Sequence, residues 1–235
     1  MDTVDLIIDA ATDFYNELQQ DKNGRYRSWE YCYSTFCAAR SNNHADVDYL
    51  SLMLAFYLAS WGMYRGSSFL LQKDYKVHIP VVEELLNPRY DRLIDMKCVD
   101  FRNADVQNLI LEDLHGFMKD YYKTIRASVA EKKPKNDISD TLITKILMGT
   151  LACVPAYDRY FIAGIKETKV STGNYNVQSI LKLADFYEAN NEKLEATRKT
   201  LKIGGLPYPQ MKMIDMGFWR IGFNMDTAKG LKNAH

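Results

Sequence analysis

The chain has 235 residues, of which 47% are hydrophobic and 26% charged, and its 30 basic and 30 acidic side chains give a formal net charge of zero. A chain of this length can bury a full hydrophobic core, as one domain or as two small ones. Proteins that hold nucleic acid through its phosphates usually carry a basic excess, so zero net charge argues against that class unless basic side chains gather locally.

Helical periodicity dominates the N-terminal part of the chain. The first predicted helix has Asp2 or Thr3 as its N-cap and ends before Gly24. Its apolar side chains recur at the spacing of one helix face, and they are Leu6, Ile7, Ala10, Phe14 and Leu18. A second helix is predicted to begin at Ser28, and the polar residues 41–44 form a loop after it.

Sixteen uncharged, mostly apolar residues run from Tyr49 to Tyr64. A transmembrane helix needs about 20 apolar residues, and the charged Asp48 and Arg65 bound this run, so we do not expect it to span a membrane. Asp46 is a suitable N-cap. Because the run is apolar on every side, it is typical of a helix surrounded by others. We therefore predict a buried central helix over about residues 47–65.

The remainder of the chain also follows helical spacing. Pro80 suits the first turn of one helix, and Asn87 both ends that helix and caps the next. Two short helices are expected, one after Pro80 and one after Asn87, and a long helix is expected from Asn103 to Val129. The next helix ends at Gly149, and another begins after Pro155. Residues 177–201 form one helix or two that are split near Asn190, and the last helix follows Pro209. No segment indicates a β-hairpin or a βαβ unit.

These patterns predict an all-α, multi-helical globule packed around the central helix, with roughly nine to eleven helices of ordinary length. We expect a single helical domain over residues 1–235. The alternative is two helical halves divided in the polar linker at residues 131–137.

The central apolar run breaks into Arg65, Gly66, Ser67 and Ser68. Serine hydroxyls and free backbone N–H groups at a new helix start, with Arg65 beside them, favour an anion such as a phosphate. The simpler interpretation, which we favour, makes Ser67 or Ser68 an N-cap only. Arg65 then pairs with an internal carboxylate such as Asp158 or Asp215.

Residues 140–165 have a helix–turn–helix outline, with Gly149 at the turn and Asp158 one turn into the second helix. This segment resembles the helix-hairpin-helix DNA glycosylases. The resemblance implies that the hairpin backbone contacts a DNA phosphate and that Asp158 is the catalytic carboxylate. Thr150 and Leu151 replace the hairpin's paired glycines, and Lys145 lies on the preceding helix rather than in the hairpin.

A simpler interpretation of the same segment needs no activity, and we favour it. Pro155 opens a helix, and Asp158 in the first turn is stabilised by the helix dipole and by a nearby arginine.

Two other segments, LASWGMYRGSS and CVPAYDRYF, resemble parts of uncharacterised bacterial all-helical proteins to which no activity is assigned. That resemblance implies a bacterial, cytoplasmic setting. The four cysteines share no metal-type spacing, so we expect free thiols. Glu112 and His115 form one Glu-x-x-His pair on a predicted helix, but a di-iron site needs a second copy. We predict no metal and no cofactor.

The predicted site gathers Arg65, Ser67, Ser68, Asp158 and Arg159. Trp219 near the C-terminus is a further candidate, because its ring could stack on a base; docking of the last helix onto the core is the alternative. The leading hypothesis is binding of a phosphate-bearing partner, nucleic acid among them, on a glycosylase-like scaffold. The rival is a non-enzymatic interaction or homo-oligomerisation protein, for which the 16 tyrosines and zero net charge are suited. The sequence does not decide whether the protein is an enzyme.

Overall fold

The computed structural model describes residues 2–41, 45–129 and 137–232. It is 75% helical, which confirms the predicted all-α class. The α-helices are α1 (Thr3–Gln20), α2 (Ser28–Ser41), α3 (Val47–Ser60), α4 (Ile79–Leu85), α5 (Ala104–Asn108), α6 (His115–Val129), α7 (Asp140–Thr150), α8 (Arg159–Thr168), α9 (Val177–Ala189), α10 (Asn191–Arg198) and α11 (Gln210–Lys232).

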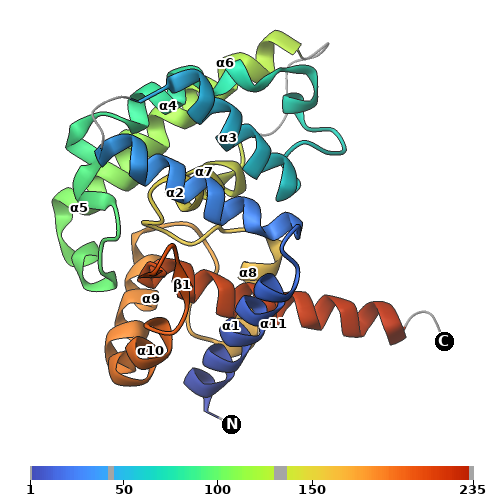
Figure 1. Cartoon of the computed structure of the whole chain (residues 1–235), viewed down its shortest axis with the longest axis vertical. Coiled ribbons are helices and arrows are strands. Elements are labelled where there is room, and N and C mark those ends of the chain that lie inside the picture. The colour runs from blue at the N-terminus through green and yellow to red at the C-terminus, as the bar shows by residue number, and fades with distance from the viewer. Residues whose placement is uncertain (1, 42–44, 130–136, 233–235) are drawn as a thin grey trace.

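Short helical turns connect several of these helices. They are η1 (Arg25–Arg27), η2 (Phe69–Gln72), η3 (Tyr75–His78), η4 (Pro88–Leu93), η5 (Cys98–Arg102) and the π-helical turn η6 (Leu109–Leu114). In Figure 1, α2, α3, α4 and α6 occupy the upper half of the molecule, and α1 and α8–α11 occupy the lower half. Helix α7 lies in the upper half as well, behind α2 and α3, and the C-terminal end of α11 projects away from the body (Figure 1).

Local capping explains several helix starts. The Asp46 carboxylate accepts a hydrogen bond from the Tyr49 backbone N–H at the start of α3, and the Asn103 side chain caps α5 in the same way. Pro80 lies in the first turn of α4, where its missing N–H costs nothing. These starts match the prediction because an N-cap needs only side chains that are neighbours in sequence.

The helix expected after Pro155 starts three residues later than predicted. Residues 151–158 are not helical, and α8 begins at Arg159 with Asp158 as its N-cap. The backbone N–H of Ala156 donates to the Asp215 carboxylate (2.9 Å), and that of Tyr157 donates to the Thr144 hydroxyl (2.9 Å). In a helix that began at Ala156 these two N–H groups would have no intrahelical acceptor, whereas here tertiary acceptors satisfy them, and residues 151–158 stay non-helical.

A small hairpin corrects the expectation of no β-structure. Strands β1 (Lys202–Ile203) and β2 (Leu206–Pro207) pair antiparallel across Gly204 and Gly205. Both glycines have positive φ, 55° and 86°, as the tightest hairpin turn requires. The prediction was wrong because a Gly-Gly pair flanked by so little strand carries almost no periodic signal.

Helix α3 is only partly buried, which corrects the expectation of a central helix enclosed on every side. Leu50, Leu54, Tyr57 and Leu58 are buried in the core. On the opposite face Tyr49, Leu52 and Phe56 are 49%, 46% and 53% exposed. The sequence pattern could not distinguish the two faces, because both carry large apolar side chains.

Buried apolar residues from both sides of the 131–137 linker belong to one hydrophobic cluster. The linker itself, apart from Asp137, lies outside the described residues, so a domain boundary there stays a prediction. Among the helices of the described ranges, none is both long and apolar enough to cross a membrane.

A buried histidine joins two tyrosines beside α6. His78 is fully buried, and its two ring nitrogens hydrogen-bond to the hydroxyls of Tyr64 (2.7 Å) and Tyr122 (2.6 Å). Burial lowers the pKa of His78 from 6.5 to about 3. The imidazole is therefore neutral in the folded protein at any ordinary pH.

We expect this histidine to destabilise the fold in mild acid. Below pH 6.5 the unfolded chain binds a proton at His78 that the folded chain does not, so stability falls as pH falls from 6.5 towards 3. The expected loss between neutral pH and about pH 5 is about 2 kcal/mol, measured by urea unfolding at a series of pH values. Glu195, whose pKa is lowered to about 2, contributes only below pH 4.5 and does not overlap this range.

The matched variant is His78→Phe, which keeps an aromatic ring and removes the titrating group. We expect the slope of stability against pH above pH 4.5 to flatten in this variant. An equal slope in the variant and the wild type would assign the acid sensitivity to another group.

Candidate functional site

A cavity of about 280 Å³ opens where the C-terminal end of α3 meets η1, α7, α8 and α11. Three arginines line it, and we call it the arginine pocket: Arg25 from η1, Arg65 from the turn after α3, and Arg159 from the first position of α8. All three arginines are exposed. The pocket therefore has a cationic rim built from three segments that are far apart in sequence.

The floor of the pocket holds a buried ion pair between Lys145 of α7 and Asp158. The ammonium nitrogen lies 3.2 Å from Asp158 Oδ2, and the two side chains are 5% and 10% exposed. Lys145 also donates to the Trp61 carbonyl oxygen (2.8 Å). The Trp219 indole N–H donates to the same carboxylate oxygen at 3.3 Å. Both charges are thus partnered, as burial requires.

The other oxygen of Asp158 ties the pocket to helix α8. Asp158 Oδ1 accepts from the backbone N–H groups of Tyr160 (3.0 Å) and Phe161 (3.1 Å). A carboxylate at a helix N-terminus is stabilised by these donors and by the helix dipole. Asp158 lies at the start of a helix, where the predicted stabilisation by the dipole would act, but its cationic partner is a lysine instead of an arginine.

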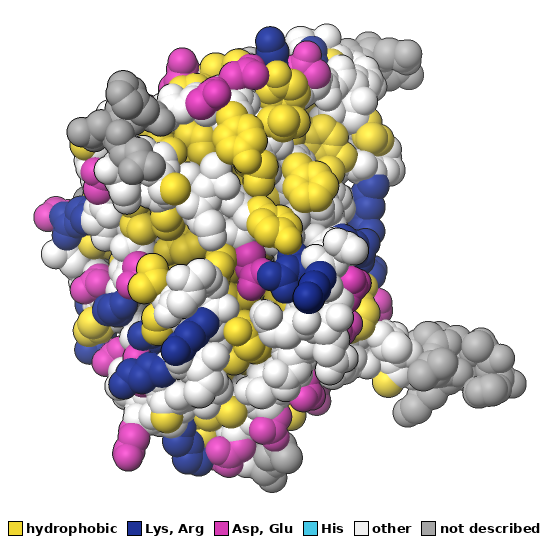
Figure 2. All heavy atoms as spheres, viewed as in Figure 1, with side chains coloured by type: hydrophobic (Ala, Val, Ile, Leu, Met, Phe, Trp, Pro, Cys, Tyr) yellow, Lys and Arg dark blue, Asp and Glu magenta, His cyan; other side chains and the backbone are white. Residues whose placement is uncertain are grey.

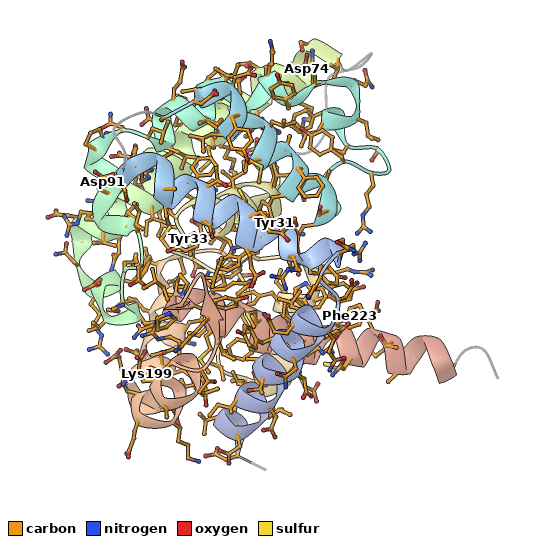
Figure 3. The ribbon with its side chains drawn as sticks, in the orientation of Figure 1. Tyr31, Tyr33, Asp74, Asp91, Lys199 and Phe223 are labelled. Carbon is orange, nitrogen blue, oxygen red and sulfur yellow. The ribbon has the colours of Figure 1, made fainter. Side chains whose placement is uncertain are left out.

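Aromatic rings form one wall of the pocket, and we call them the aromatic cluster: Tyr26, Trp61, Tyr160, Trp219 and Phe223. The Trp61 and Trp219 ring centres are 5.7 Å apart, and Trp219 stacks on Phe223 at 5.0 Å. Phe223 lies on α11 near α1, at the start of the projecting part of the helix (Figure 3). Edge-to-face and stacked contacts of this kind hold the wall rigid.

Two of the rim arginines lie over tyrosines of this cluster. The Arg25 guanidinium is 4.6 Å from the centre of the Tyr26 ring, and that of Arg159 is 4.3 Å from the centre of the Tyr160 ring. Arg159 also reaches Asp226 at 3.2 Å. Arg25 also donates a hydrogen bond to the Tyr26 hydroxyl (2.6 Å), and Arg159 donates to the Tyr160 hydroxyl, so only the remaining N–H groups of each guanidinium are available to a ligand.

A second buried ion pair lies on the other side of Trp61. Lys212 and Asp215 of α11 are 3.1 Å apart and only 2% and 3% exposed. The Lys212 ammonium is 4.6 Å from the Trp29 ring centre and 5.3 Å from that of Trp61. Burial raises the pKa of the Asp215 carboxyl, Lys212 opposes that rise, and the negative charge of Asp158 adds to it.

Four of the six predicted site residues line this pocket: Arg65, Asp158, Arg159 and Trp219. The other two do not. Ser67 is exposed in the turn after Arg65, and Ser68 caps the four-residue η2 by accepting from the Leu70 N–H. The helix expected to start at these serines is therefore a single short turn.

The favoured pairing of Arg65 with an internal carboxylate is wrong. Asp158 pairs with Lys145 and Asp215 with Lys212. Within the described ranges Arg65 makes no ion pair, and its side chain lies at the pocket instead. Two lysines embedded in apolar helices already satisfy both buried carboxylates, which leaves the arginine free to face solvent.

Gly149 does not form the turn of a hairpin. It lies inside α7, and a Cβ there would collide with the Tyr57 ring of α3. This glycine permits close packing of α7 against α3, so its presence is explained without a phosphate contact. Asp158 is likewise the N-cap of α8 and not a residue one turn into it.

The position of Trp219 does not suit the predicted stacking of its ring on a base. It is 3% exposed, with Phe223 stacked on it and its N–H bonded to Asp158. It therefore docks α11 onto the core, as the alternative interpretation had it.

Sequence reasoning missed Lys145 as a site residue, together with Arg25, Tyr26 and Trp61. One signal for Lys145 was available: it is the only charged side chain between Asp140 and Asp158. A lone charge in an apolar helix must find a buried partner. Lys212 carries a different signal, because Asp215 follows it at the i, i+3 spacing of a helical ion pair. Nothing local marks Arg25, because its role depends on how η1 packs.

The described ranges contain no group of three or more His, Cys, Asp or Glu side chains arranged to hold a metal ion. His115 of the Glu-x-x-His pair instead bonds to Asp140 at 3.0 Å. The four cysteines are free, and Cys32, Cys98 and Cys153 are buried. Burial raises the pKa of each of these three thiols, which makes them poor nucleophiles.

Comparison with protein-family models, with curated proteins and with solved structures finds no match. The resemblance of residues 140–165 to helix-hairpin-helix DNA glycosylases, and that of two segments to bacterial helical proteins, therefore stay predictions. So does the cytoplasmic setting.

Proposed function

We propose that the arginine pocket binds the phosphate group of a phosphate-bearing partner, either a nucleotide or a nucleic acid strand. The observation that carries this proposal is the convergence of three exposed guanidinium groups on one cavity. Arginine forks match phosphate oxygens in geometry and charge, and such bonds are about twice as strong as neutral ones. Arg65, which makes no ion pair within the described ranges, is the best placed of the three.

The size of the cavity limits how much of the partner it accepts. Small-molecule sites start at roughly 300 Å³, and the arginine pocket is close to that limit. One nucleotide unit therefore fills it, and any longer strand must continue across the surface. The zero net charge is compatible with this role, because the basic side chains gather at one place.

The glycosylase-like form of the proposal assigns Asp158 the catalytic role. Its carboxylate lines the pocket and is held in place by Lys145, Trp219 and two backbone N–H groups. Such a fixed negative charge would stabilise the positive sugar formed when a base leaves. Water would supply the hydroxyl to the sugar and the proton to the departing base. Release of a base from an oligonucleotide, lost in Asp158→Asn, is the test of this form.

Phosphate binding predicts a measurable effect of one arginine. Arg65→Ala should weaken binding of a short labelled oligonucleotide by about tenfold, because one charge-assisted hydrogen bond contributes about 1.5 kcal/mol. The slope of log affinity against log salt concentration should fall by about one unit. Fluorescence anisotropy with single-stranded DNA, duplex DNA, RNA and a nucleoside monophosphate measures both quantities and ranks the partners.

The matched control is Arg102→Ala, which removes an exposed arginine outside the pocket that pairs with Asp185 at 2.7 Å. It should leave affinity and salt slope unchanged. If none of the four probes binds the wild type even at low salt, or if both variants weaken binding equally, the pocket is not the phosphate site.

A second candidate function is protein interaction by self-association. The observation that favours it is the exposed apolar face of α3, formed by Tyr49, Leu52 and Phe56. Apolar side chains gather over α2 and α3 on the face shown in Figure 2. Patches of this kind mark interaction surfaces more often than single exposed apolar residues do. Sedimentation of the full chain over a range of concentrations tests self-association.

A further inference from the structure

The exposed face of α3 is a stripe without charge. Tyr49, Leu52, Phe56 and Ala59 are all exposed and follow one another at helical spacing, so they line one side of the helix. Tyr31 of the adjoining α2 is 47% exposed as well. Burying several large apolar side chains would remove a substantial unfavourable contact with water. This stripe would therefore be stabilised by a partner that covers it.

The two ends of the stripe carry opposite charges. Asp46 and Asp48 lie at its N-terminal end together with Asp74, whose neighbour Tyr75 donates a hydrogen bond to Asp48 (2.9 Å). Lys76, 3.9 Å from Asp48, offsets only part of this negative charge. The C-terminal end meets the arginine pocket, where Ser60 shares the lining with Arg25 and Arg65. Figure 3 shows Asp74 at the top of the molecule, away from Phe223 at the pocket.

We infer that the partner of this stripe is a second copy of the chain, with the two α3 helices packed antiparallel about a two-fold axis. An antiparallel pairing brings the acidic end of each helix to the arginine end of the other, so both ends are complementary at once. A nucleic acid strand is disfavoured on this stripe, because the acidic end would repel its phosphates. The inference rests on the self-association proposed as the second function and is independent of phosphate binding.

The side-chain sizes along the stripe fit the same axis. An axis that passes midway between Leu52 and Phe56 sets Leu52 opposite the partner's Phe56. The same axis sets Tyr49 opposite the partner's Ala59, so that the largest ring faces the smallest side chain. Alternation of large and small residues lets two helices interdigitate closely. One register therefore satisfies both the packing and the charges.

Sedimentation equilibrium and light scattering at a series of protein concentrations test this arrangement. The wild type should approach twice the chain mass of 27.2 kDa as concentration rises. Phe56→Lys should weaken the dimer at least a hundredfold, because it places two lysines against apolar partners. The side chain is half exposed in the single chain, so the variant should fold, which circular dichroism checks. The control Leu206→Lys changes a 71% exposed apolar residue on the hairpin and should leave the dimer intact.

A charge exchange tests the antiparallel direction. Asp48→Arg should weaken the dimer, and adding Arg65→Asp to the same chain should restore part of the lost affinity, because the pair is then reversed. A wild type that stays monomeric at every concentration would contradict self-association itself. If the dimer persists in Phe56→Lys, or if Leu206→Lys weakens it as much as Phe56→Lys does, the protein self-associates through a surface other than α3.

Discussion

Gly164→Ala should reduce the free energy of unfolding by about 3 kcal/mol or more, or prevent folding altogether. Gly164 lies on α8, and a Cβ at this position would collide with the Phe218 carbonyl oxygen of α11. On the other side of the contact, a Cβ at Gly222 would collide with the Tyr160 carbonyl oxygen. The obstacle at each glycine is backbone, which cannot rotate away as a flexible side chain can.

The consequence extends to the arginine pocket. Helices α8 and α11 share the most extensive contact between two elements of the described structure. These helices carry Arg159, Tyr160, Trp219 and Phe223 of the pocket lining. An added methyl group that forces the helices apart would therefore displace two sides of the pocket. Any folded Gly164→Ala protein should lose the oligonucleotide binding expected of the wild type.

Urea unfolding followed by circular dichroism measures the loss of stability. The matched control is Gly116→Ala in α6, where an added Cβ meets nothing within 4 Å. That variant should be stabilised by up to about 1 kcal/mol, since alanine has the better helix propensity. Equal stability of Gly164→Ala and the wild type would show that α8 and α11 do not pack as closely as the structure has them.

The second large effect is expected at the buried pair beneath Trp61. Asp215→Ala should cost about 3–5 kcal/mol, because it leaves the Lys212 ammonium buried without a carboxylate. It also removes the acceptor for the Ala156 N–H, which holds the segment leading to Asp158. A loss of this size is a large part of the total stability of an ordinary domain, about 5–15 kcal/mol.

Two controls separate the buried charge from other effects. Asp185→Ala breaks an exposed pair with Arg102 and should cost no more than about 1 kcal/mol. The double variant Lys212→Met with Asp215→Leu removes both charges and should recover much of the loss, since buried pairs are often replaceable by apolar residues. A single variant as stable as Asp185→Ala would mean that Lys212 reaches water.

Helix positions were largely predictable because they depend on short-range signals. The caps Asp46 and Asn103 act on backbone groups two or three residues away, and the apolar stripe of α1 repeats every three or four residues. Short-range signals also explain why the predicted start of α8, before Asp158, was wrong. The neighbours of Asp158 suit a first helical turn, but tertiary bonds to Ala156 and Tyr157 decide where α8 begins.

The candidate site was only half predictable. Arg65 stood out because a cation ends an apolar run, and Asp158 because it lies at a helix start. Their relationship was not predictable, since the partner of Asp158 is Lys145, thirteen residues away on another helix, and Arg65 pairs with neither buried carboxylate. Pairings of this kind depend on packing, for which a single sequence has no local signal.

The sequence by itself therefore determined the all-α class, most helix boundaries and the location of the uncharged run that became α3. Tertiary structure alone decided which face of α3 is exposed, which charges pair, and that three distant arginines share one cavity. The physical reason is the distance along the chain over which each interaction acts. Capping and periodicity act over a few residues of chain, whereas burial and ion pairing depend on which helices meet in space.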